Sequence, residues 1–142
     1  RVNQIKNKMK IINYTSYPVA DALETLADVL KIPSDTVLRI KQTPQAIRQG
    51  EAEFIGLIQP VEHSPRLYDL YLSPCVSAST LPKVLAHECV HLAQYASGRL
   101  SVQGSTVMFD GQAYKYDLYD SFSPWENEAF KMQTKLLKLI KK

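Results

Sequence analysis

The stretch His87-Glu88-Cys89-Val90-His91 decides how the rest of this chain is interpreted, because it has the pattern H-E-x-x-H inside a segment with helical spacing. Residues four apart on an α-helix differ in direction by only about 40°, so the two imidazoles project from one face and can bind one Zn²⁺. Glu88 falls beside them, and a carboxylate that does not bind the metal can take a proton from zinc-bound water. The competing interpretation is a surface helix with two solvated histidines. A random chain of this length, however, shows the pattern only on the order of once in several hundred.

The segment around the motif is predicted to be a helix with two different faces. Ser79 or Thr80 is the expected N-cap, Pro82 falls in the first turn, and Gly98 follows the end. At about 100° per residue, the apolar residues of this helix lie opposite the histidines. Cys89 is among them, so we expect a small buried hydrophobic residue there and not a ligand or a nucleophile.

The composition is that of one globular domain. The chain has 142 residues, of which 45% are hydrophobic and 22% charged, so we expect a single domain over residues 1–142, with residues 1–12 and 136–142 peripheral. No apolar run approaches the roughly 18 residues of a membrane span, and no secretory signal is visible. Two cysteines are too few for a disulfide framework. These features favour a cytoplasmic monomer with no membrane partner.

Charge is unevenly distributed along the chain. The two ends supply nine of the 17 basic residues, whereas residues 11–130 carry eight basic and 14 acidic residues, a net charge of −6. An acidic body argues against a phosphate-binding surface, so we expect no nucleic-acid partner. The basic ends are interpreted as solvated helix faces. Salt-dependent retention of DNA or RNA, lost on removal of the ends, would indicate the opposite.

Upstream of the motif, the hydrophobic pattern predicts one helix and about three strands. Residues 1–12 are predicted to be a helix or an irregular terminus. The expected segments are a helix from Pro18 that ends before Pro33, strands Thr36–Lys41, Glu53–Gln59 and Arg66–Leu72, and a turn or short helix over Pro44–Gly50. Together with the motif helix they predict an α+β fold with a small mixed or antiparallel sheet. We expect the strand Arg66–Leu72 to border the cleft, with an exposed edge that pairs with an extended peptide.

Downstream of the motif, the sequence predicts a β-hairpin and a helix. The hairpin joins Val102–Phe109 to Gln112–Tyr119 through a tight turn at Asp110-Gly111. Its aromatic residues are expected to pack across the strands, although one tyrosine near a metal could stabilise an oxyanion. The helix covers Pro124 to Lys142 and carries an apolar stripe together with two glutamates near its start.

A catalytic zinc ion needs a third protein ligand besides the two histidines. A third histidine in H-E-x-x-H-x-x-G-x-x-H is excluded, because the residues after His91 contain neither the required glycine nor the histidine. His63 lies upstream in a loop-like stretch. The aspartates in hairpin or linker sequence are possible ligands, namely Asp110, Asp117 and Asp120. The remaining candidates are Glu126 and Glu128 on the last helix.

The motif and the later segment Trp125-Glu126-Asn127-Glu128-Ala129 together resemble the gluzincin zinc metallopeptidases, in particular the small single-domain minigluzincins. The resemblance covers chiefly residues 66–130, with 34 residues between His91 and Glu126. It implies that a glutamate on a second helix is the third ligand, with Glu126 and Ala129 matching the family pattern E-x-x-A. Phe130 departs from the Asp or Asn that follows in that pattern and would usually orient a ligand.

Glu126 has a structural alternative of its own. Ser123-Pro124-Trp125-Glu126 is a capping box, in which Glu126 would bond back to the Ser123 amide. Glu128 is then the second choice, and since the two glutamates lie about 200° apart on a helix, only one can face the metal. We favour Glu126.

The function expected from these residues is zinc-dependent peptide hydrolysis. His87, His91 and Glu126 would bind Zn²⁺, and Glu88 would act as the general base and acid towards a peptide or protein substrate in extended conformation. The alternative is a latent or non-catalytic zinc-binding interaction domain with the same fold.

Overall fold

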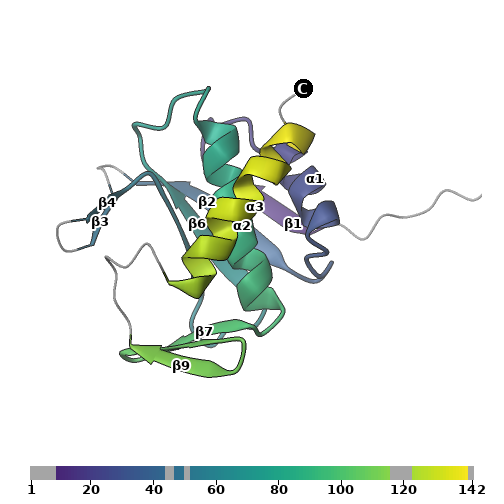
Figure 1. Cartoon of the computed structure of the whole chain (residues 1–142). Coiled ribbons are helices and arrows are strands. Elements are labelled where there is room, and N and C mark those ends of the chain that lie inside the picture. Colours follow the sequence, from purple (N-terminus) through teal and green to yellow (C-terminus); the bar gives the residue numbers. More distant parts are fainter. Residues whose placement is uncertain (1–8, 44–46, 50–51, 116–122, 141–142) are drawn as a thin grey trace, which may run out of the picture.

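The computed structural model describes residues 9–43, 47–49, 52–115 and 123–140 of the chain. Over these ranges the fold is α+β, as predicted, with three helices, a mixed sheet of four strands and a separate antiparallel sheet of three strands. In Figure 1 the helices lie in front of the larger sheet and the smaller sheet lies below them. None of the described helices is long and apolar enough to cross a membrane.

The larger sheet has the strand order β1-β2-β6-β5 within the described residues. These strands are β1 (Lys10–Asn13), β2 (Val37–Gln42), β5 (Gly56–Pro60) and β6 (Leu67–Leu72). β2 pairs in parallel with both β1 and β6, whereas β5 pairs with β6 as an antiparallel hairpin. Alternate residues point to opposite faces, and on one face Leu38 and Ile40 of β2 and Leu70 and Leu72 of β6 are completely buried.

Three helices lie on that side of the sheet: α1 (Ala20–Val29), α2 (Leu81–Ala96) and α3 (Pro124–Ile140), with α3 packed on α1 and α2. α2 contacts β5, α1 and α3, so it is the central helix of the core. Its core face includes Leu85, Cys89 and Leu92. The prediction that Cys89 is buried is confirmed, and burial raises the pKa of its thiol.

A glycine allows α2 to approach the sheet closely. A Cβ atom added to Gly56 of β5 would lie 2.6 Å from Val84 Cγ1 and 3.4 Å from Glu88 Cγ. Carbon atoms in contact are normally about 3.5–4.0 Å apart. The absence of a side chain at this position therefore sets the distance between β5 and the motif helix.

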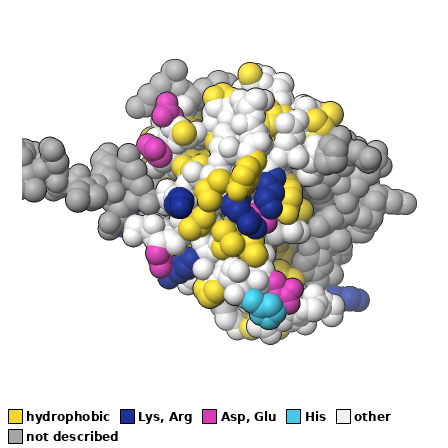
Figure 2. All heavy atoms as spheres, turned by 180° about the vertical axis from the view of Figure 1, so that it is seen from behind, with side chains coloured by type: hydrophobic (Ala, Val, Ile, Leu, Met, Phe, Trp, Pro, Cys, Tyr) yellow, Lys and Arg dark blue, Asp and Glu magenta, His cyan; other side chains and the backbone are white. Residues whose placement is uncertain are grey.

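The opposite face of the larger sheet carries paired charges. Figure 2, seen from behind, shows basic side chains gathered around an acidic one, with apolar side chains beside them. Across β2 and β6, Arg39 donates to both carboxylate oxygens of Asp69, at 2.6 and 2.9 Å, and Lys41 lies 3.4 Å from the same carboxylate.

The smaller sheet consists of β7 (Leu100–Gln103), β8 (Thr106–Phe109) and β9 (Gln112–Lys115). The predicted tight turn is confirmed, because Asp110 and Gly111 both have positive φ, 50° and 82°. The single strand predicted over Val102–Phe109 is wrong, since Gly104 with φ 61° turns the chain between β7 and β8. Tyr116 to Tyr119 lie outside the described residues.

Several predictions for the upstream half need correction. Residues 10–13 form β1, and residues 47–49 and 52–54 form the antiparallel pair β3 (Ile47–Gln49) and β4 (Ala52–Phe54). The strand predicted over residues 53–59 is therefore two strands, in different sheets. Residues near both ends of the described chain also contribute to the core, since Met9 and Leu136 are buried in it and Ile140 packs against it.

The exposed edge next to the motif helix is also not the predicted one. β6, which contains most of Arg66–Leu72, is an inner strand, because β2 occupies one of its edges and β5 the other. Among the described strands, β5 is the edge strand that contacts α2.

Candidate metal centre

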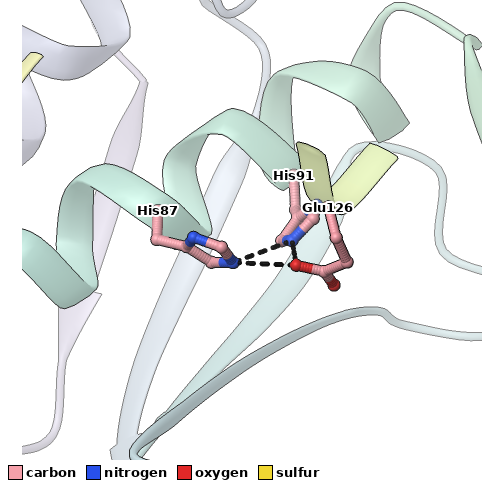
Figure 3. Close-up of side chains that lie close together, drawn as sticks. All are labelled: His87, His91 and Glu126. Atoms are coloured by element: carbon pink, nitrogen blue, oxygen red, sulfur yellow. Dashed lines mark hydrogen bonds and ion pairs between the residues drawn. The ribbon is translucent and has the colours of Figure 1, made fainter. Parts of the chain in front are cut away.

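Two helices bring His87, His91 and Glu126 together. The histidines project from one face of α2, and Glu126 reaches them from the first turn of α3 (Figure 3). Glu126 Oε1 lies 3.0 Å from His87 Nε2 and 3.2 Å from His91 Nε2, and the two Nε2 atoms are 3.3 Å apart. Candidate ligand atoms of the three residues all lie within 4.8 Å of one another, so the group could hold a metal ion.

The spacing of these atoms can be compared with what zinc requires. A tetrahedral ion with bonds of about 2.0–2.1 Å separates its ligand atoms by roughly 3.3–3.4 Å. The observed separations of 3.0–3.3 Å are close to that value, so small movements of the side chains would admit the ion. The donor set of two imidazoles and one carboxylate also suits zinc. The same atoms lie within hydrogen-bonding distance of one another and form a compact cluster.

The start of α3 is held in place by aromatic packing. Trp125 packs edge-on against Phe109 and Tyr114 of the smaller sheet, with ring centroids 6.0 and 5.4 Å apart. These two ring contacts hold Trp125 in place, and its carbonyl oxygen accepts a hydrogen bond from Gln94 near the end of α2. Glu126 is the next residue in the chain. The smaller sheet thus helps to position the carboxylate.

Glu128 faces away from the histidines, as the helix geometry requires. Its carboxylate oxygens lie 2.9 and 2.8 Å from the two terminal nitrogens of the Arg99 guanidinium. The same carboxylate accepts a hydrogen bond from the Gln94 amide at 2.9 Å. Of the two glutamates considered as the third ligand, Glu126 is therefore the one that the fold brings to the histidines.

Comparison of the chain with family models, with curated proteins and with solved structures finds no match. The resemblance to gluzincins therefore remains a hypothesis carried by the residues themselves.

Glu126 and His91 stabilise each other's charged forms in this cluster. Burial alone would raise the pKa of Glu126, but hydrogen bonds from His87 and His91 lower it to about 2. Burial likewise opposes the charged form of His91, but its hydrogen bond to Glu126 and the negative charge of Glu88 raise its pKa to about 9. A carboxylate and an imidazolium thus face each other where a cation would bind.

Glu88 lies beside this cluster and not in it. It is 8% exposed, on the side of α2 that meets Gly56 of β5. Burial raises the pKa of its carboxyl group, and the nearby histidines act in the opposite direction. A buried carboxyl group with a raised pKa next to a metal site is suited to accept and release a proton.

The other ligand candidates are not brought to the site. The side chain of His63 is 89% exposed and lies 3.2 Å from Glu62. Asp110 is paired with Arg99 at 2.7 Å. Asp117 and Asp120 lie outside the described residues.

Two glutamines that sequence reasoning missed contact the histidines. Gln133 Oε1 lies 2.7 Å from His87 Nδ1, and Gln94 Oε1 lies 2.8 Å from His91 Nδ1. A signal for both exists in the sequence, since Gln94 is one turn beyond His91 and Gln133 is two turns beyond Glu126 on the same helix face. Gln133 supplies the contact that the resemblance places at Phe130. Phe130 instead packs at a tilt against the His87 ring, with centroids 4.8 Å apart and the ring planes 56° apart.

Proposed function

We propose that this protein is a zinc-dependent peptidase. The observation that carries the proposal is the convergence of His87, His91 and Glu126 from two helices at metal-ligand spacing, beside a buried carboxyl group, Glu88. Three protein ligands that leave a position for water are the arrangement of catalytic zinc sites, whereas structural sites are closed by four.

Each residue has a defined role in this proposal. His87, His91 and Glu126 hold the ion, which when bound supplies a Lewis acid and a water of lowered pKa. Glu88 would take the proton from the attacking water and then donate it to the leaving amine. A proton acceptor positioned in this way contributes about 10²–10⁴-fold to rate.

The proposed substrate is a peptide in extended conformation, bound along β5. Val61 N–H donates to Leu67 O and Ser73 N–H donates to Ile55 O. Residues of antiparallel strands alternate between hydrogen-bonded and non-bonded pairs, so the backbone groups of Gly56 and Ile58 point away from β6. The Ile58 N–H donates to the carboxylate of Glu88, so a peptide on this edge of the sheet would pair with the remaining backbone groups of β5. A peptide added to that edge would run past α2 and the metal-binding residues.

The test is Glu88→Gln, which keeps the shape of the side chain but removes the proton acceptor. We expect the variant to retain stoichiometric zinc and to lose cleavage of an unstructured protein by at least about 10²-fold. Glu62→Gln, at a side chain that is 87% exposed, is the matched control and should cleave normally. Undiminished cleavage by Glu88→Gln would refute the role of Glu88. A zinc-loaded wild type with no chelator-sensitive cleavage would instead favour the non-catalytic zinc-binding domain.

A further inference from the structure

His91 is contacted on its far side by a buried glutamine. Gln94 is 1% exposed, and its Oε1 atom lies 2.8 Å from His91 Nδ1. We propose that Gln94 is the positioning residue that fixes the tautomer of His91 for metal binding, and that Glu128 and Arg99 hold Gln94 in that orientation. The inference rests on the proposed metal centre but concerns residues outside it.

The orientation of the Gln94 amide is set by its two other partners. Its Nε2 atom lies 3.1 Å from the carbonyl oxygen of Trp125 and 2.9 Å from Glu128 Oε1. A backbone carbonyl and an ionised carboxylate can only accept hydrogen bonds, so the NH₂ group must face them. The oxygen of the amide must then face His91.

This orientation determines where the hydrogen of His91 resides. An amide oxygen can only accept, so His91 Nδ1 must carry the hydrogen and donate it to Gln94. A neutral imidazole has a single N–H group. When His91 gives up the proton that it shares with Glu126 and becomes neutral, as metal binding requires, the lone pair is therefore on Nε2, the atom that faces His87 and Glu126. Neutral imidazole with a free Nε2 is the form that binds zinc.

Glu128 is itself held by a network that reaches the smaller sheet. Arg99 binds Glu128 through both terminal nitrogens, and it also donates to Asp110 at 2.7 and 3.0 Å. Bidentate pairs of this kind fix the orientation of the guanidinium and carboxylate planes. The glutamate that does not face the metal thus acts on the site indirectly, through Gln94.

His87 provides an internal comparison, because its glutamine lacks such support. Among the described residues, His87 is the one hydrogen-bond partner found for the Gln133 side chain. Loss of Glu128 should therefore affect His91 through Gln94 and leave the contact between His87 and Gln133 unchanged.

The experiment uses Zn²⁺ as the probe and four variants of the full chain. Gln94→Met removes both hydrogen-bonding functions at similar volume, Glu128→Met removes the group that holds Gln94, and the third variant combines the two. Gln103→Met, at an exposed position of β7, is the matched control. Zinc affinity is measured by competition with a chelating dye, and the Nδ1–H proton of His91 is followed by NMR in the zinc-loaded protein.

We expect Gln94→Met to weaken zinc binding by about 10–100-fold and to move the Nδ1–H signal of His91 or exchange it with water. Glu128→Met should weaken binding less and should add almost nothing in the Gln94→Met background, because its effect passes through Gln94. Gln103→Met should bind as tightly as the wild type. A merely structural role for Glu128 would give additive losses.

The outcomes separate the two proposals. A wild type that binds no zinc overturns both. If the wild type binds zinc, two results overturn only the role of Gln94. One is that Gln94→Met binds zinc as tightly as the wild type. The other is that the losses of zinc affinity in Gln94→Met and Glu128→Met add in the double variant. If Gln94→Met does not fold, Glu128→Met, whose side chain is 28% exposed, carries the test alone. In that case, an unchanged His91 Nδ1–H signal contradicts the proposal.

Discussion

Glu126 and His91 are charged partners, and each shifts the pKa of the other. Glu126 has its pKa lowered to about 2, and His91 has its pKa raised to about 9. A lowered carboxyl pKa stabilises the fold above the ordinary pKa of about 4.5, and this contribution is lost as the pH falls through 2. A raised imidazole pKa stabilises the fold below about 6.5, and this contribution is lost as the pH rises through 9.

We therefore predict that the metal-free protein loses stability in two pH windows, from about 6.5 up to 9 and from about 4.5 down to 2. Glu126→Gln removes the charge that couples to His91, so its stability should vary less with pH in the upper window. The measurement is urea unfolding in the presence of a chelator over a series of pH values. Parallel pH profiles for the wild type and Glu126→Gln would show that the pair contributes nothing.

Residues of the candidate site could be predicted where helix geometry alone places them. The four-residue spacing of His87 and His91 defined one face of a helix, and the angular separation of Glu126 and Glu128 meant that only one of them could face the metal. Which one did depended on how α3 lies on α2, and a capping box offered Glu126 another role. Gln94 and Gln133 were not predicted, because their spacing places them on the same helix faces as His91 and Glu126 but does not show which group each amide contacts until the packing of α2 and α3 is known.

At the scale of the elements, the contact between β5 and α2 depends on Gly56. The Cβ atom of an alanine there would lie 2.6 Å from Val84 Cγ1. Valine is branched at Cβ and stiff, and Val84 is buried, so the clash requires a shift of the helix or the strand. The contact also borders Glu88, whose Cγ would lie 3.4 Å from the added carbon.

We predict that Gly56→Ala lowers the free energy of unfolding by about 1–3 kcal/mol, the usual cost of overpacking. Cleavage should fall as well, since the carboxyl group of Glu88 would be displaced, whereas zinc content should remain. Gly104→Ala is the comparison: an added Cβ meets no atom within 4 Å there, although the positive φ of 61° gives a backbone cost. If Gly56→Ala and the wild type have the same free energy of unfolding, α2 can move away from β5 without loss of stability, which would contradict the prediction.

Elements with strong local periodicity were predicted better than those defined by pairing. α1, α2 and α3 and the strand β6 follow from spacing and end signals in the sequence. β1 was missed because four residues are too few to show the alternation of apolar and polar residues by which a strand is recognised. β6 was assigned to the edge of the sheet because parallel pairing with β2 brings together distant segments, and no hydrophobic pattern reports which strands become neighbours. The change matters for function, because it transfers the proposed peptide-binding edge from β6 to β5.

At the scale of the whole molecule, the candidate metal centre joins two helices that are distant in sequence. α2 contributes both histidines and α3 contributes the carboxylate, and the two helices pack directly on each other. An ion bound by all three residues would cross-link α2 to the C-terminal helix. Whatever binds the folded state and not the unfolded chain stabilises the fold. Metal binding at this site would therefore raise the global stability of the protein.

We predict that zinc raises the unfolding temperature of the wild type, by roughly 10 °C when zinc exceeds its Kd about 100-fold, and that a chelator reverses the effect. Glu126→Gln should lose most of this stabilisation because α3 then contributes no carboxylate, whereas Glu128→Gln should retain most of it because the Gln94 amide keeps an acceptor. Thermal unfolding of both variants with zinc and with chelator makes the comparison. A full zinc-induced shift in Glu126→Gln, with stoichiometric metal, would mean that the third ligand lies elsewhere in the chain. In that case the proximity of Glu126 to the histidines would be an ion pair of the metal-free fold.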